Sequence, residues 1–236
     1  MIDPQRDLAS VRQATERLLT AATDLDNARL AGPSRLPGWS RGHVLAHLSR
    51  NADALVNVLE GRPMYPSAEA REHDIERGSG RPLDVQLADV GDSATAFQAV
   101  AGLPADWERV VALRGGVTDR AARIPFRRLI EVELHHVDLD VGYDLEDLPA
   151  DFTLREIAFL AERFSGHADV PPLRISASGD VGAWFTGGTD GSPITVSGPA
   201  PSLLGWLAGR RTGDALTDLA VDGAATAAGP PALPPL

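Results

Sequence analysis

Apolar residues recur at spacings of three and four positions through most of residues 5–165, and this periodicity predicts a largely helical region. In the first predicted helix, for example, Leu8, Val11 and Leu18 fall on one face. Gly- and Pro-rich stretches separate the helices, and Ser40 is a suitable N-cap for the second of them. The predicted helices cover residues 8–22, 40–60, 67–77, 83–101, 107–113, 125–142 and 153–166.

The pattern changes after Pro172, where apolar and polar residues alternate in short runs that are separated by Gly- and Asp-rich turns. Such alternation is typical of half-buried strands. Strands are predicted at residues 173–177, 183–186, 194–196 and 219–221, and a short helix at residues 201–208. The fold class is therefore predicted to be α+β. A helical bundle covers residues 1–168, and a small ββ(β)αβ domain with a Pro-rich tail covers residues 169–236.

The charge of the chain narrows its possible partners. With 33 acidic and 22 basic residues the net charge is −11, which disfavours nucleic acid and anionic membrane surfaces. No run of 18 apolar residues is present, so no membrane span is predicted. The first residues lack the apolar segment of a signal peptide, and the expected location is therefore the cytoplasm.

Two residue types are missing from the 236 residues, because the chain contains neither cysteine nor lysine. It therefore has no disulfide, no thiolate nucleophile of its own and no lysine for a Schiff base. Any metal must be bound by His, Asp or Glu side chains. Any anionic substrate must be held by arginine, the only basic residue type besides histidine.

Two histidine clusters are candidates for a metal site. His43 and His47 stand four positions apart on one predicted helix and so share a face. Glu131 and His135 show the same spacing on a later helix, and His136 follows directly. Helical bundles often assemble metal sites from a carboxylate and imidazoles on neighbouring helices. Three such ligands leave a coordination position open, as catalytic zinc sites do.

Spacing alone leaves three alternatives open: His43 or His47, Glu131 or Glu133, and His135 or His136. The competing interpretation needs no metal, because His43 can cap its helix and a later histidine can be a hydrogen-bonded core residue.

Other polar residues could support such a site. Asp138 and Asp140 are candidate hydrogen-bond partners for a ligating histidine, although acids at a helix end are more often only solvated. The doublets Arg127–Arg128 and Arg210–Arg211 could bind a dicarboxylate, although surface arginines are more often solvated too. Trp39 is predicted to serve in packing.

Four stretches carry a resemblance to a known family. They are Leu36–Ala52 with the sequence LPGWSRGHVLAHLSRNA, Pro63–Arg71, Arg128–Leu139 and Leu207–Arg210. In this order they resemble the motifs of the mycothiol-dependent maleylpyruvate isomerase family, and together they extend over nearly the whole chain. The resemblance implies a DinB-like four-helix bundle that binds zinc, followed by a small α/β domain.

The resemblance also implies which residues act and what they do. The zinc ligands of the family match His47, Glu131 and His135, and its functional arginine matches Arg210. The implied reaction is the zinc- and mycothiol-dependent cis–trans isomerisation of maleylpyruvate to fumarylpyruvate, a step of gentisate breakdown. It would proceed by thiolate addition, bond rotation and elimination.

The expected partners are mycothiol and a small anionic electrophile, with no nucleic acid and no membrane. The chain is expected to be a monomer or a weak homo-oligomer. Two alternative functions remain. One is a mycothiol S-transferase that acts on another electrophile on the same scaffold, and the other is a non-catalytic helical binding module.

Overall fold

The computed structural model describes residues 2–103, 106–223 and 229–235, and the chain divides into two compact units, residues 1–144 and 145–236. The first unit is helical and the second contains a small sheet, so the predicted α+β class is confirmed. Over the described residues, no helix combines the length and the apolar character that a membrane span needs.

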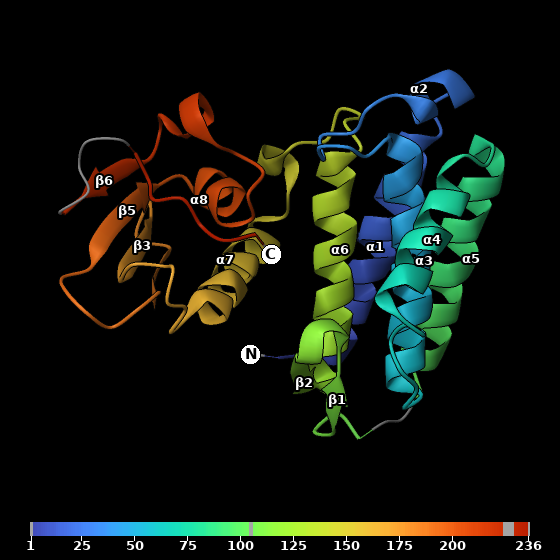
Figure 1. The fold of residues 1–236 in the computed structure, drawn as a ribbon, viewed down its shortest axis with the longest axis horizontal. Coiled ribbons are helices and arrows are strands. Elements are labelled where there is room, and N and C mark those ends of the chain that lie inside the picture. The colour runs from blue at the N-terminus through green and yellow to red at the C-terminus, as the bar shows by residue number, and fades with distance from the viewer. Residues whose placement is uncertain (1, 104–105, 224–228, 236) are drawn as a thin grey trace. The chain divides into compact units, whose positions relative to one another are not determined.

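Four long helices form the bundle of the first unit, and they lie side by side in Figure 1. They are α1 (Pro4–Ala22), α3 (Arg41–Leu59), α5 (Leu83–Ala101) and α6 (Ile124–Asp138). Two shorter helices join them, α2 (Asn27–Ala31) and α4 (Ala68–Ser79), and α4 packs against α3. The predicted bundle is thus present, and its core is built from the apolar faces that the periodicity indicated.

Local signals in the sequence account for several helix ends. Ser40 caps α3: its hydroxyl accepts a hydrogen bond from the backbone N–H of His43, and the His43 ring accepts one from the Ser40 backbone N–H. This reciprocal pair is a capping box in which histidine takes the place of glutamate. Pro125 lies in the first turn of α6, where its missing N–H costs no intrahelical hydrogen bond.

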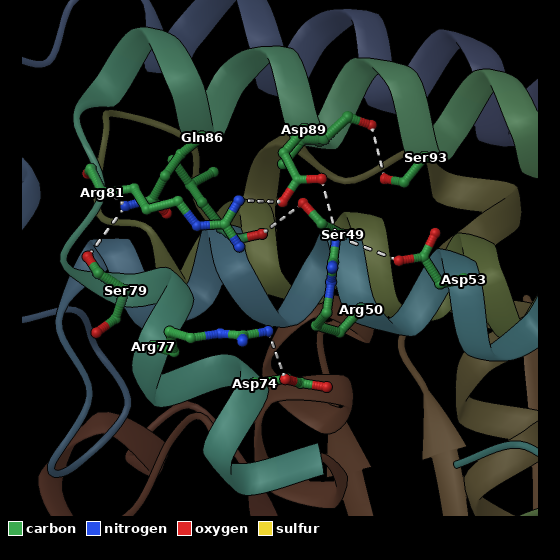
Figure 2. A network of polar contacts seen from close by, with 12 residues as sticks. Ser49, Arg50, Asp53, Asp74, Arg77, Ser79, Arg81, Gln86, Asp89 and Ser93 are labelled. Atoms are coloured by element: carbon green, nitrogen blue, oxygen red, sulfur yellow. Dashed lines mark hydrogen bonds and ion pairs between the residues drawn. The ribbon is translucent and has the colours of Figure 1, made fainter. Parts of the chain in front are cut away.

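An ion pair joins α3 to α5 (Figure 2). Asp89 on α5 accepts hydrogen bonds from Arg50 on α3, at 2.8 Å, and from Arg81 in the preceding loop, at 3.1 Å. The Gln86 amide also donates to the backbone carbonyls of Ser79 and Arg81, both at 3.0 Å. These contacts hold the end of α4 and the start of α5 against α3, the helix that carries His47.

A close backbone approach between α3 and α4 makes glycine necessary at position 42. A Cβ atom there would lie 2.2 Å from the Ser79 carbonyl oxygen. We expect Gly42→Ala to lower the free energy of unfolding by about 1–3 kcal/mol, because a helix must shift to accept the methyl group. Chemical denaturation measures this loss. Gly80→Ala is the matched control, since a Cβ atom there meets nothing within 4 Å. Equal stability of the two variants would contradict the expectation.

One predicted helix is wrong. Residues 107–113 were expected to be helical, but Val110–Ala112 form a strand, β1, that pairs antiparallel with β2 (Thr118–Arg120). Short 3-10 turns follow each strand, η1 (Arg114–Gly116) and η2 (Ala121–Arg123). A three-residue strand is too short to show a period of two, and its apolar residues can equally suggest a helix. Pro104, which was expected to separate this segment from the preceding helix, lies outside the described residues.

The second unit begins with helix α7 (Ala150–Phe164), after a short 3-10 turn, η3 (Leu145–Asp147). A four-stranded sheet follows, in the order β4-β3-β5-β6, with β3 parallel to β5 and the other pairs antiparallel. The strands are β3 (Leu173–Ala177), β4 (Gly182–Thr186), β5 (Ile194–Gly198) and β6 (Ala220–Asp222), and α8 (Ala200–Leu207) and η4 (Gly213–Leu216) lie between the last two along the chain. This succession of strands, helix and strand is the predicted one.

The boundary between the two units precedes α7. It was expected at residue 168, whereas the compact units divide after Asp144. Helix α7 contacts α8 and β4, and the Thr186 hydroxyl donates a 2.6 Å hydrogen bond to the Ala161 carbonyl of α7. The periodicity of α7 resembles that of the bundle helices, because a helix with one apolar face shows the same pattern whether it covers a helix or a sheet.

Candidate metal centre

Helices α3 and α6 bring together one histidine from the first cluster and two residues from the second. The Glu131 carboxylate oxygen Oε2 lies 2.9 Å from Nε2 of His47 and 3.3 Å from Nε2 of His135. One donor atom from each of these three residues lies within 4.8 Å of the others. Both histidines are buried, whereas 32% of the Glu131 side chain is exposed, so the cluster is reached from solvent at Glu131.

The His135 ring is oriented by a buried carboxylate. Asp138, which has no exposed surface, lies with Oδ2 2.8 Å from Nδ1 of His135. The Nδ1–H group donates to this oxygen, and Nε2 is then the ring nitrogen that faces Glu131 and His47. This carboxylate–histidine arrangement is the usual support of a metal-ligating histidine.

The charges of the three residues follow from this packing. Burial lowers the pKa of His47 to about 4, although its hydrogen bond to Glu131 acts in the opposite direction. Burial raises the pKa of Glu131, but the hydrogen bonds from His135 and His47 outweigh it and hold that pKa well below the usual value. Burial lowers the pKa of His135, and the contacts with Asp138 and Glu131 raise it above the ordinary value. Glu131 is therefore an anionic ligand and His47 a neutral one at neutral pH.

The donor set fits a zinc ion. Ligands at about 2.05 Å in a tetrahedral shell lie about 3.3 Å from each other. The distances from Glu131 to His47 and to His135, 2.9 and 3.3 Å, are close to this separation, so zinc binding would require little movement of the side chains. Two imidazoles and one carboxylate form a typical catalytic zinc set with an open fourth position.

The hydrogen bond from His135 to Asp138 yields a testable consequence. We expect Asp138→Asn to weaken zinc binding about 10–100-fold, because loss of such a carboxylate releases the ligand ring and lowers its basicity. Competition with a chelator measures the dissociation constant. Asp140→Asn is the control, since Asp140 is exposed and pairs with Arg35 and Arg41 instead. Equal zinc affinity of both variants would show that Asp138 does not support the site.

The other members of the two histidine clusters have different partners. His43 lies in the capping box of α3, and its Nε2 is 3.0 Å from Glu76. Glu133 accepts hydrogen bonds from Arg17 at 2.6 Å and from the Tyr143 hydroxyl at 2.9 Å. His136 stacks on Tyr143, with ring centroids 3.9 Å apart. Of the alternatives that spacing left open, the structure thus brings His47, Glu131 and His135 together.

Three neighbours of the cluster were not assigned to it from the sequence. The Trp39 ring lies 5.5 Å from the His47 ring between centroids. Arg71 on α4 has its Nη2 atom 3.3 Å from Nδ1 of His47, and its guanidinium lies 5.8 Å from the centre of the Tyr65 ring. Tyr65 and Arg71 belong to a stretch that carries the family resemblance, but no spacing rule connects them to His47.

The C-terminal arginine doublet belongs to the second unit. Arg210 donates a 2.8 Å hydrogen bond to the Ala208 carbonyl. Arg211 donates to the Ser202 hydroxyl at 3.0 Å and forms an ion pair with Glu146. The stem of Arg211 also packs on Gly205, where a Cβ atom would lie 2.9 Å from it. Arg211 thus has a structural role within its own unit.

Known proteins resemble this chain over nearly its full length. The family model of the mycothiol maleylpyruvate isomerase N-terminal domain matches residues 11–140, and that of the MDMPI C-terminal domain matches residues 147–230. No curated protein matches the chain. The crystal structure of the mycothiol-dependent maleylpyruvate isomerase matches with a TM-score of 0.87 at 23% identity, over 99% of this chain and 97% of that one.

A second crystal structure, of a histidine-to-alanine mutant of the mycothiol-dependent maleylpyruvate isomerase, matches with the same TM-score and coverage at 22% identity. At this level of identity the two crystal structures establish a shared fold. The two family models together span most of the sequence, in the order that the four motifs predicted. The chain therefore belongs to the mycothiol maleylpyruvate isomerase family.

Proposed function

We propose that this protein catalyses the zinc- and mycothiol-dependent isomerisation of maleylpyruvate to fumarylpyruvate. The observation that carries the proposal is the cluster of His47, Glu131 and His135 in a chain without cysteine. Such a set suits the activation of a thiol that a second molecule supplies. Membership of the family supports the same assignment.

The reaction itself requires a thiol. A carbon–carbon double bond does not rotate at ambient temperature, but addition of sulfur converts it into a single bond that does. Elimination of the sulfur then restores the double bond in the trans form. A free thiol has a pKa of about 8.5 and is mostly protonated at neutral pH. A zinc ion held by these residues would supply the activation, because metal coordination deprotonates a thiol.

Several side chains of the protein would orient the metal ligands and bind the substrate. Asp138 fixes the ring of His135, and the low pKa of Glu131 keeps its carboxylate charged. The Trp39 ring lies 5.5 Å from the His47 ring between centroids and packs beside this ligand. Arg210, which matches the functional arginine of the family, would donate to the substrate where negative charge develops. The proposal also implies a small anionic substrate and action in the cytoplasm.

An ultraviolet assay of maleylpyruvate conversion tests the proposal. The zinc-loaded protein should convert maleylpyruvate to fumarylpyruvate with mycothiol present and should not do so without it. Analysis of the products separates the isomerase from an S-transferase, because a transferase releases a thioether adduct and an isomerase returns the free thiol. Accumulation of an adduct, or conversion that does not depend on mycothiol, would overturn the proposal.

A further inference from the structure

Arg71 is a cation beside the candidate metal centre, and among the described residues it has no carboxylate partner. It lies in the first turn of α4, where it contacts the ring nitrogen of His47 and the face of the Tyr65 ring. None of the described carboxylates forms an ion pair with it. Many other arginines of the first unit, including Arg17, Arg50 and Arg127, pair with acids. In a chain of net charge −11, an arginine without an acid at this position is unexpected.

The contact between Arg71 and His47 cannot persist once His47 binds a metal. A guanidinium only donates hydrogen bonds, so Nδ1 of His47 must accept and Nε2 must carry the proton that faces Glu131. A histidine that ligates a metal through Nε2 has its proton on Nδ1 instead. Two donors would then face each other at 3.3 Å. Metal binding therefore releases the guanidinium of Arg71 from His47.

The positive charge around Arg71 favours the binding of an anion beside it. Arg128 on α6 is fully buried. Its Nη1 donates to the Leu48 carbonyl and to Asn51, while its Nε and Nη2 atoms have no hydrogen-bond partner among the described residues. With a divalent ion bound, Arg71 and Arg128 would add to its positive charge, against the carboxylates of Glu131, Asp138 and Asp53, the last of which interacts with Arg128. A negatively charged ligand would offset this excess.

A cavity that could hold such a ligand lies beside Tyr65, the aromatic residue that Arg71 contacts. Tyr65 lines a cavity of about 680 Å³ in the first unit, together with Ser67 and Arg114. The cavity thus lies next to the aromatic ring over which the Arg71 guanidinium is placed.

We propose that Arg71, released from His47 when the metal binds, forms a bidentate ion pair with a carboxylate of the substrate. Arg71 would be a substrate-binding residue in the same unit as the metal ligands, in addition to Arg210 in the other unit. The identity of the anion rests on the proposed function, since the substrate is a dicarboxylate. Planar guanidinium and carboxylate groups match in geometry, which makes arginine well suited to this role.

The test uses maleate, a cis dicarboxylate, as a probe of the zinc-loaded protein without any thiol. Titration calorimetry should show that Arg71→Ala weakens maleate binding about 10–100-fold, the effect expected for a charge-assisted pair. The KM for maleylpyruvate should rise by a similar factor, and Arg71→Lys should restore part of both losses. Zinc affinity, measured by chelator competition, should be unchanged or tighter in Arg71→Ala, because a competing contact of His47 is removed.

Arg77→Ala is the matched control, since Arg77 lies on the same helix, pairs with Asp74 and is exposed (Figure 2). It should leave zinc affinity, maleate binding and KM unchanged. Unchanged maleate binding and KM in Arg71→Ala, or a loss of zinc from that variant, would overturn the inference. Maleate binding that depends on Arg71 in a protein without isomerase activity would instead overturn only the proposed function.

Discussion

His47→Ala should remove zinc from the protein and abolish its isomerase activity. Loss of an orienting carboxylate behind a ligand already costs about 10–100-fold in metal affinity, and loss of the ligand itself should cost more. His47 is buried in α3, and its Nε2 lies 2.9 Å from Glu131. Metal analysis of the purified variant, together with the maleylpyruvate assay, measures both effects.

His43→Ala is the control for this experiment, because His43 lies on the same helix four positions earlier. Its ring caps α3 and contacts Glu76. We expect the variant to keep its zinc and to lose only about 1 kcal/mol of stability, as is usual when a capping interaction is removed. If His43→Ala lost zinc and His47→Ala retained it, the assignment of ligands would be reversed.

Arg210→Ala should keep its zinc and lose about 100-fold in kcat. A charged donor that acts on negative charge in the transition state contributes roughly 3 kcal/mol in a dry site. Arg210 lies in the second unit, whereas the three ligands belong to the first. Steady-state kinetics and metal analysis on the same preparation separate the rate effect from a loss of metal.

The neighbouring Arg211 provides the comparison for Arg210. Arg211 pairs with Glu146 and its stem packs on Gly205. We expect Arg211→Ala to lower the melting temperature of the protein while kcat changes little. A large loss of kcat in Arg211→Ala, with wild-type kinetics in Arg210→Ala, would show that the second arginine of the doublet has the functional role.

Helix boundaries were predictable where local chemistry sets them. Helix α5 covers residues 83–101, as the apolar spacing indicated, and α3 begins directly after Ser40. Both depend on the residues of the segment itself, namely on a repeated apolar face and a capping side chain. The strand β1 was missed because its stability comes from pairing with residues 118–120, which the pattern within residues 110–112 does not reveal.

The candidate site was predictable in part. Spacing on the helices reduced the metal ligands to two clusters, since residues four apart share a face whatever the rest of the fold does. Spacing did not identify the ligand within each cluster, because that depends on how α3 and α6 are oriented about their axes when they pack together. The family motifs indicated His47, Glu131 and His135, and the structure brings these three together. Neither spacing nor motif predicted the contact of Arg71 with His47.

The sequence by itself determined what kind of chemistry is available to this protein. Because the chain has no cysteine or lysine, any thiol must come from another molecule, any metal must be bound by His, Asp or Glu, and any anion must be held by arginine. Only the tertiary structure decided which of those groups meet. Glu131 is 84 positions from His47 and Arg71 is 24, so their distances depend on how α3, α4 and α6 pack. That packing is set by the sum of many side-chain contacts, such as the close approach at Gly42, and no single segment specifies it.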